Sequence, residues 1–385
     1  MKSSLSLKTA LIPLIVLIGL LAFNVIVYGD DALSGSNQFI LLIGGAVAAM
    51  VGFANKISYQ TMLDKVADNL KSVTGAILIL LFVGALAGTW LISGVIPAMI
   101  YYGLQILHPS IFLPACVIIC ALISLATGSS WTTSATVGIA LIGIGKALGI
   151  PVGMVAGAVL SGAYFGDKLS PLSDTTNLAP AMAGADLFTH IRYMTHTTVP
   201  SILVTLIVFI ILGIGFSGDG AAKSQELLAA MNEVFTINLL LFIVPIIVIV
   251  MIVRKTPPLV ALFVGTILGA IAALIFQQEL LLSLSGESAL SLYGTYQVII
   301  DAITVSTEIE TSSAALTDLF QSGGMEGMLG TIWLIICAMV FGGVMDAIGA
   351  LSTISAALLS MAQSTFQLFA STVASCLAIN ITASD

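Results

Sequence analysis

The sequence predicts an all-α polytopic membrane protein. Of its 385 residues, 58% are hydrophobic and only 8% are charged, whereas soluble domains carry about 25% charged residues. Eleven Lys and Arg and nineteen Asp and Glu are too few to cover a soluble fold of this length. The alternation of polar and apolar residues found in porin strands is absent, so each apolar stretch is expected to cross the bilayer as a helix. Soluble enzymes and nucleic-acid binders are excluded, the latter also by the net charge of −8.

Hydropathy over a window of about 19 residues, the length of a membrane-crossing helix, locates the spans. We predict eleven spans, with more possible in an intact chain, at residues 10–28, 38–54, 73–93, 111–127, 131–147, 150–166, 197–216, 236–253, 258–276, 327–348 and 365–381. Segments 95–107 and 350–362 are short and follow Gly94 and Gly349, so we expect broken or re-entrant helices there. Residues 58–71 predict an amphipathic helix that lies at the membrane interface or, equally, a solvated connecting helix.

The distribution of charge predicts the sidedness. Lys and Arg cluster at the N-terminus, within 56–71 and at 254–255, whereas residues 277–326 hold seven acidic residues and no basic one. By the positive-inside rule the N-terminus is expected in the cytoplasm and the acidic segment outside.

An internal repeat is predicted by matches at an offset of 255 residues. Gly88 and Gly94 recur as Gly343 and Gly349, and the hydroxyl-rich segment that starts at Thr127 recurs at the end of the chain. A chance match of small residues in a glycine-rich chain is the alternative. Paired interrupted segments are the best sequence indication of a transporter's binding site, because half-helix ends offer dipoles and free carbonyls at mid-membrane.

The second copy of this pattern stops much earlier than the first. A terminal carboxylate at membrane depth costs several kcal/mol unless it is hydrated or paired, so we expect that a C-terminal part is missing. On this basis we divide the chain into N-terminal spans with an interfacial helix (1–72), a first repeat (73–216), linking spans with the acidic segment (217–326) and a truncated second repeat (327–385).

The most informative polar segment is residues 162–180, which follows an apolar span. It holds two carboxylates with several hydroxyl and amide side chains, and Pro171 frees a backbone carbonyl there. Oxygen ligands of this kind suit a hard cation such as Na⁺, whereas a transition metal prefers thiolate or imidazole. Asp167 and Asp174 are therefore the leading candidates for a cation site. A polar loop outside the membrane, with Asp167 paired to Lys168, is the alternative.

Polar residues also interrupt three apolar stretches. Residues 127–136 carry seven hydroxyls around Gly128 and predict an unwound helix break, with simple helix packing as the alternative. Residues 380–385 add an amide and a carboxylate to the same chemistry. Asp346 lies inside a span with no basic neighbour in sequence, so we expect either a proton-carrying group or a residue hydrogen-bonded into the bundle.

Several other functions are disfavoured by what the sequence lacks. No Walker A, Ser/His/Asp or GxSxG pattern is present, so ATP-driven transport and hydrolysis have no support. The four cysteines lie in apolar stretches without metal-ligand spacing. We expect no cofactor.

The run Gly-Asp-Lys-Leu-Ser-Pro-Leu-Ser-Asp-Thr-Thr-Asn-Leu-Ala-Pro at 166–180 closely resembles the signature of the NhaC family of bacterial sodium/proton antiporters, within the ion-transporter superfamily. Segments 127–131, 185–194 and 380–385 are similar to further segments of that family, in the same order. The resemblance implies a secondary transporter rather than an enzyme, multi-pass in the bacterial inner membrane, with inverted repeats that meet near mid-membrane. By analogy with the superfamily it also implies an elevator-type movement and a homodimer.

Candidate site residues follow from oxygen chemistry and from position in these motifs. The carboxylates expected to bind protons and Na⁺ are Asp167, Asp174, Asp346 and Asp385, with Na⁺ held at the first two. The other polar residues expected to bind cation or substrate are Thr127, Ser129, Ser130, Ser170, Ser173, Thr175, Thr176, Asn177, Asn380, Thr382 and Ser384.

Two functions remain open at this point. The first is a Na⁺/H⁺ antiporter that exports sodium, in which the two ions compete for the same carboxylates. The second is a sodium-coupled organic-anion exchanger of the malate–H⁺/Na⁺–lactate type, in which half-helix N-termini at the two Ser/Thr-rich breaks bind the anion. A channel or scaffold without coupled exchange leaves the paired breaks unexplained. The partners expected for the first function are Na⁺, H⁺, the bilayer and a second copy of the chain, and the second function adds the organic anion.

Overall fold

The structure is a computed structural model of the chain. It describes residues 5–106, 108–171, 173, 176, 179–180, 185–216, 220–254, 256–312, 317, 320–360 and 364–382. In these residues the secondary structure is helical apart from one short antiparallel pair, β1 (Thr307–Glu308) with β2 (Gln321–Ser322). The predicted all-α class is confirmed.

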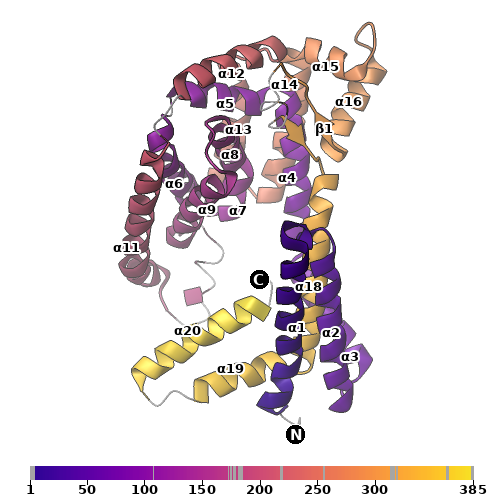
Figure 1. Ribbon diagram of the computed structural model, residues 1–385, viewed down its shortest axis with the longest axis vertical. Helices are drawn as coiled ribbons and strands as arrows, with labels where there is room; N and C mark the ends of the chain where they lie inside the picture. Colours follow the sequence, from indigo (N-terminus) through magenta and orange to yellow (C-terminus); the bar gives the residue numbers. More distant parts are fainter. Residues whose placement is uncertain are drawn as a thin grey trace. The chain divides into compact units, whose positions relative to one another are not determined.

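Helices occupy all eleven predicted stretches, with ends within three residues of the predicted bounds except for α11, which begins ten residues before the predicted 197 (Figure 1). In chain order they are α1 (Leu7–Tyr28), η1 (Gly29–Leu33), α2 (Ser36–Ala54), α3 (Tyr59–Ser72), α4 (Thr74–Ile92), α5 (Val95–Ile106), α6 (Pro109–Thr127), α7 (Ser130–Thr133), the π-helical turn η2 (Ser134–Gly138), α8 (Ile139–Ala147), α9 (Val152–Leu169), α11 (Leu187–Ile214), α12 (Gly220–Val234), η3 (Leu239–Phe242), α13 (Ile243–Val253), α14 (Pro258–Phe276), α15 (Gln278–Ser285), α16 (Leu292–Thr304), η4 (Glu326–Met328), α18 (Leu329–Ala347), α19 (Ala350–Ser360) and α20 (Thr365–Thr382).

Polar side chains just before several helices set where these helices begin. Ser58 accepts a hydrogen bond from the Thr61 backbone N–H (3.1 Å) at the start of α3, and Ser291 accepts one from Gly294 (2.9 Å) at the start of α16. Such caps satisfy one of the N–H groups that a helix leaves unpaired at its N-terminus.

The number of membrane spans is smaller than predicted. Within the described ranges, seven helices are long and apolar enough to cross a membrane: α1, α2, α4, α6, α11, α14 and the helix from Glu326 to Ala347. The bent pair Leu227–Val234 and Leu239–Val253 would make an eighth. The predicted span at 236–253 corresponds to the helical stretch Leu239–Val253, and the chain turns by 85° just before it. Helices also occupy the other predicted stretches, but they are shorter or more polar, as at the Asp167–Lys168 end of α9.

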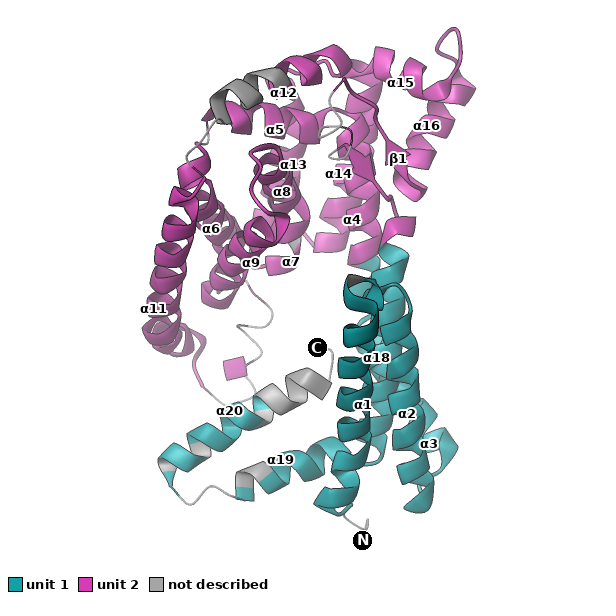
Figure 2. Cartoon of the chain, in the orientation of Figure 1, with its two compact units in different colours: residues 1–78, 328–385 teal, residues 79–327 magenta. Residues whose placement is uncertain are grey.

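The chain divides into two compact units, coloured separately in Figure 2. Unit 1 comprises residues 1–78 and 328–385, and unit 2 comprises residues 79–327. The four-part division made from the sequence stays a prediction.

In unit 1, α1, α2, α3 and α18 enclose a core that includes Leu17, Met62 and Phe341. A Cβ on Gly343 of α18 would lie 2.6 Å from the Cα of Val66, so α18 rests directly on the backbone of α3. Asn24 of α1 adds a polar contact, because its Nδ2 donates to Oδ1 of Asn37 on α2 (2.8 Å).

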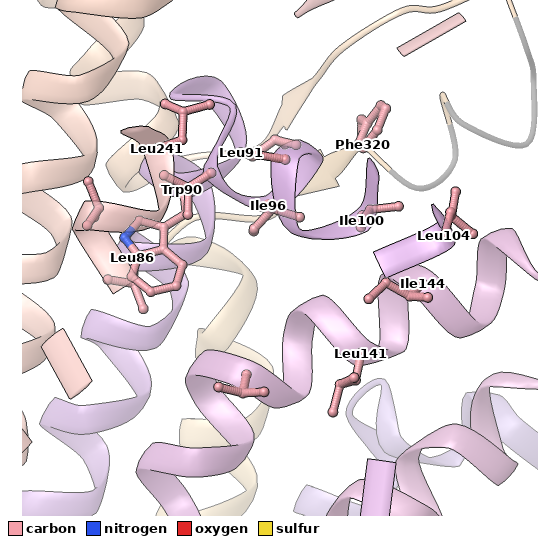
Figure 3. Close-up of a cluster of buried hydrophobic side chains, with 14 of the residues drawn as sticks. Leu86, Trp90, Leu91, Ile96, Ile100, Leu104, Leu141, Ile144, Leu241 and Phe320 are labelled. Carbon is pink, nitrogen blue, oxygen red and sulfur yellow. The ribbon is translucent and has the colours of Figure 1, made fainter. Parts of the chain in front are cut away.

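Unit 2 has a larger core, centred on the large buried side chains of α4, α5, α8 and η3 (Figure 3). Trp90 of α4 is 2% exposed, and its indole N–H donates to the Gly265 carbonyl of α14 (3.1 Å). A Cβ on Gly88 would meet the Ala302 carbonyl of α16, so α4 contacts the backbone of that helix.

Two helices and the elements that follow them match at the same offset in the sequence. α4 and α18 are both 19 residues long, and they begin and end 255 positions apart, at Thr74–Ile92 and Leu329–Ala347. Gly94 and Gly349 follow them with similar backbone angles, φ of 79° and 73°, and the short helices α5 and α19 come next. Only glycine adopts such left-handed angles at little cost.

Candidate functional site

The predicted helix break at 127–136 is present. α6 ends at Thr127, and Gly128 has a φ of 70° and donates its N–H to the Ser124 carbonyl (2.7 Å). This left-handed glycine closes the helix. A new helix starts at Ser130 and passes through the π-helical turn 134–138 into α8. Both the break and the π turn leave backbone groups outside the regular helical ladder, and π turns are frequent at functional sites.

α9 lies against α6 with almost no space between the backbones. A Cβ on Gly162 would meet the Val117 carbonyl, and one on Gly166 would meet the Ala121 carbonyl and lie 2.6 Å from the Leu125 amide nitrogen. Glycines four residues apart on one helix face allow this approach between membrane helices. The contact brings the last turn of α9 beside the break that follows α6.

The central contact of the site joins these two elements. The hydroxyl of Ser130, the first residue of α7, donates to Oδ2 of Asp167 on α9 (3.0 Å). Ser130 is buried and Asp167 is half-buried. Further hydroxyl residues around the break and the end of α9 are buried as well: Ser124, Thr133, Thr136, Ser170, Ser173 and Thr176. Among the described residues, the site thus offers the half-buried carboxylate of Asp167 and a set of buried hydroxyl oxygens.

The segment that follows α9 folds back over the end of that helix. Ser170 donates its backbone N–H to the Asp167 carbonyl (3.2 Å). The hydroxyl of Thr176 donates to the carbonyls of Asp167 (3.0 Å) and Lys168 (3.2 Å). Thr176 therefore lies against the last turn of α9, and the backbone carbonyls at that end of the helix are oxygen ligands of the kind that a cation uses.

Other predicted site residues are placed only in part. Thr127 ends α6, Ser129 lies in the break, and Asn380 and Thr382 lie in the last turns of α20. The remaining predicted site residues, Asp174, Thr175, Asn177, Ser384 and Asp385, lie outside the described residues.

Asp346 belongs to unit 1, at the end of α18. Its Oδ2 lies 3.2 Å from Nζ of Lys65 on α3, and both side chains are about half exposed. The hydrogen bond and the charge of the Asp346 carboxylate raise the pKa of Lys65. The basic partner that the neighbouring sequence lacks therefore comes from far along the chain.

Two features of the site were missed by reasoning from the sequence. Ser124, whose hydroxyl donates to the Ala163 carbonyl (2.6 Å), looks like any serine in an apolar span. The close approach at Gly162 and Gly166 could have been found from the sequence, since two small residues four positions apart lie at the start of the polar segment 162–180.

No cluster of three or more His, Cys, Asp or Glu suited to a metal ion occurs in the part of the chain that the structure describes. The described side chains at the break are instead a carboxylate and hydroxyls, which suit a weakly held, transported alkali cation.

Interrupted helices that bring polar groups together inside a helical membrane protein are typical of secondary transporters. Residues 162–385 match the Na⁺/H⁺ antiporter family. The chain is 35% identical over 335 residues to the Na⁺/H⁺ antiporter NhaC of Alkalihalophilus pseudofirmus, covering 87% of this chain and 70% of the relative. The chain therefore belongs to the Na⁺/H⁺ antiporter family.

Other relatives carry different names. The chain is 38% identical over 319 residues to the malate-2H⁺/Na⁺-lactate antiporter of Bacillus subtilis, covering 82% of this chain and 65% of the relative. It is 30% identical over 355 residues to the arginine/ornithine antiporter ArcD of Halobacterium salinarum, covering 91% of this chain and 69% of the relative. The chain thus spans about two thirds of the length of these relatives. No solved structure matches.

Proposed function

We propose that this protein exchanges Na⁺ for H⁺ and that Asp167 binds the two ions in turn. The observation that carries the proposal is the hydrogen bond from Ser130 to Asp167, which places a carboxylate at a helix break among buried hydroxyls. Family membership supports the choice of ions.

The geometry suits competition between the two ions for one group. An ionised carboxylate attracts Na⁺, and hydroxyl and carbonyl oxygens complete the coordination of a hard cation. Protonation removes the charge and with it most of the attraction. The Ser130 hydroxyl suits both states, because a hydroxyl can donate to the carboxylate and accept from the carboxylic acid. We propose Asp174 as a second carboxylate at this site, on the strength of its place in the motif.

We also infer that the chain is built from two inverted repeats. The inference is supported by the matching bounds of α4 and α18 and by the left-handed glycines that follow them. A cytoplasmic N-terminus is supported by the distribution of Lys and Arg, and a location in the bacterial inner membrane and a homodimer by the family resemblance.

Sodium-coupled exchange of an organic anion is the second candidate. It is favoured by the relative named as a malate-2H⁺/Na⁺-lactate antiporter, which is 38% identical to this chain. In that case the N-terminal end of the helix that starts at Ser130 would meet the anion's carboxylate, because helix N-termini favour negative charge.

One experiment separates the two functions. The chain is reconstituted in sealed vesicles with an acidic lumen and a pH-sensitive dye inside, and Na⁺ is added outside with and without malate, lactate or arginine. Na⁺/H⁺ exchange predicts alkalinisation of the lumen with Na⁺ alone. Alkalinisation that requires one of the organic solutes would reject the first proposal in favour of the second.

Variants then test the assignment of Asp167. Asp167→Asn should abolish Na⁺-dependent proton movement at unchanged membrane insertion. Asp68→Asn is the matched control, because Asp68 is an exposed aspartate on α3. Full exchange by Asp167→Asn would overturn the role of Asp167.

A further inference from the structure

Gln277 is a buried amide in unit 2 that connects segments far apart in sequence. It lies between α14 and α15 and is 2% exposed. Its Oε1 accepts the backbone N–H of Thr236 (3.0 Å), and its Nε2 donates to the carbonyl of the same residue (3.0 Å) and to that of Ser93 (3.3 Å). One side chain thus uses its acceptor and both of its donors on backbone groups.

Each partner of Gln277 lies where a helix is interrupted. Thr236 lies in the non-helical segment 235–238, at the 85° bend between α12 and α13. Ser93 lies between α4 and α5, next to the left-handed Gly94. A Cβ on Gly94 would meet Nε2 of Gln277, so this glycine also makes room for the amide. Gln277 itself separates α14 from α15, and three helix interruptions therefore meet at one side chain.

The helix that begins after Ser93 packs against α8, which is continuous with the helix that starts at Ser130. Along α5, a Cβ on Gly103 would lie 3.0 Å from Cγ1 of Ile144 on α8, so these two helices pack tightly. Figure 3 shows Ile144 beside Leu104 of α5. α8 continues α7 and the π turn without a gap back to Ser130, the residue that donates to Asp167.

We propose that Gln277 is a positioning residue: its amide fixes the three helix interruptions to one another and, through α5 and α8, holds Ser130 against Asp167. The consequence for transport rests on the function proposed above, whereas the fixing of the interruptions does not.

Hydrogen exchange tests the structural part directly. The Thr236 amide lies outside any helix and donates to Gln277, so its exchange with solvent reports on this contact. Gln277→Leu, in the full chain in detergent micelles, should speed exchange of the 235–238 segment roughly two- to tenfold, as expected from one lost hydrogen bond. Segment 128–133 should also exchange faster. Gln278→Leu is the matched control, because Gln278 is the exposed neighbour.

A charged variant adds a readout that loss of packing would not give. In Gln277→Glu an ionised carboxylate cannot donate to the carbonyls of Thr236 and Ser93, whereas the protonated acid restores one donor. We compare the sodium KM of each variant with that of its control at the same pH. The ratio of the KM of Gln277→Glu to that of Gln278→Glu should be several-fold above one at high pH and fall toward one as the pH falls. The ratio of the KM of Gln277→Leu to that of Gln278→Leu should be above one at every pH.

The outcomes decide the proposal even if transport differs from expectation. If hydrogen exchange of segment 235–238 is unchanged in Gln277→Leu, Gln277 does not fix the helix interruptions. If hydrogen exchange is faster there but unchanged in segment 128–133, Gln277 does not act on Ser130. If the wild-type chain moves no Na⁺, the proposed function is wrong. Hydrogen exchange of segments 235–238 and 128–133 then still tests the positioning role of Gln277.

Discussion

Gly166 offers the sharpest test of how the site is assembled. A methyl group in Gly166→Ala would lie 2.6 Å from the Leu125 amide nitrogen and would also meet the Ala121 carbonyl. Ordinary contacts begin at 3.4 Å. Since both neighbours are backbone atoms and the Ala121 oxygen lies nearer than the Leu125 nitrogen, α9 has to move from α6 by at least about 0.8 Å. Overpacking of this kind costs about 1–3 kcal/mol.

The same displacement acts on the next residue, Asp167. Its carboxylate lies 3.0 Å from the Ser130 hydroxyl, and a shift of about 0.8 Å would stretch that contact beyond hydrogen-bonding distance. We therefore expect Gly166→Ala to lower the melting temperature in detergent by several degrees and to raise the sodium KM about tenfold, as expected from the loss of a hydrogen bond to a charged group.

The control for this prediction is on the same helix. A Cβ on Gly153 of α9 would meet nothing within 4 Å, so Gly153→Ala should leave the sodium KM unchanged and, as an exposed helical alanine, slightly raise stability. If Gly166→Ala melts at the wild-type temperature and retains the wild-type KM, the close approach of α9 to α6 does not position the carboxylate.

Three further predictions concern single hydrogen bonds. Ser130→Ala should raise the sodium KM about tenfold, because it removes the same hydrogen bond to Asp167, while Ser130→Thr retains the wild-type value. A transport assay that finds the same KM for both variants would exclude a role for the hydroxyl. Trp90→Phe should lower the free energy of unfolding by about 1 kcal/mol, because the Gly265 carbonyl loses its indole partner; an unchanged denaturation midpoint would contradict this. Hydrogen bonds from Thr189 lower the pKa of Asp186, which caps α11. Since the folded pKa is depressed, the cap stabilises the helix above about pH 4 and is lost as the pH falls below that value. The protection of the first turn of α11 against hydrogen exchange, measured relative to the intrinsic exchange rate at each pH, should therefore fall there in the wild type and be low at every pH in Asp186→Ala.

Much of the fold is predictable because membrane helices are encoded locally. Runs of apolar residues locate α1, α2, α6 and α14 to within a few residues, and Gly128 among hydroxyls locates the break. The 85° bend before α13 was not predicted, since hydropathy averages over Thr236 and Asn238 and the contact with Gln277 is distant in sequence.

The site was predictable in composition but not in its pairings. Asp167 and Ser130 both stood among the candidates, yet their contact depends on the glycines that bring α9 onto α6. The sequence offered Asp167 a partner only in the alternative interpretation, a polar loop in which it pairs with the adjacent Lys168. Asp346 shows the same limit, since its partner Lys65 comes from a helix near the other end of the chain.

The discontinuous make-up of unit 1 imposes a delay during synthesis. α1, α2 and α3 emerge first, but α18, which packs on α2 and α3, follows only after the 249 residues of unit 2. At about 5–20 residues per second, the nascent helices wait on the order of 12–50 s for that partner. Throughout this interval Gly45 lacks its neighbours in the finished unit, Val340 and Phe341 of α18. Insertion of this protein into the membrane therefore has to tolerate a long-lived, half-assembled helical hairpin.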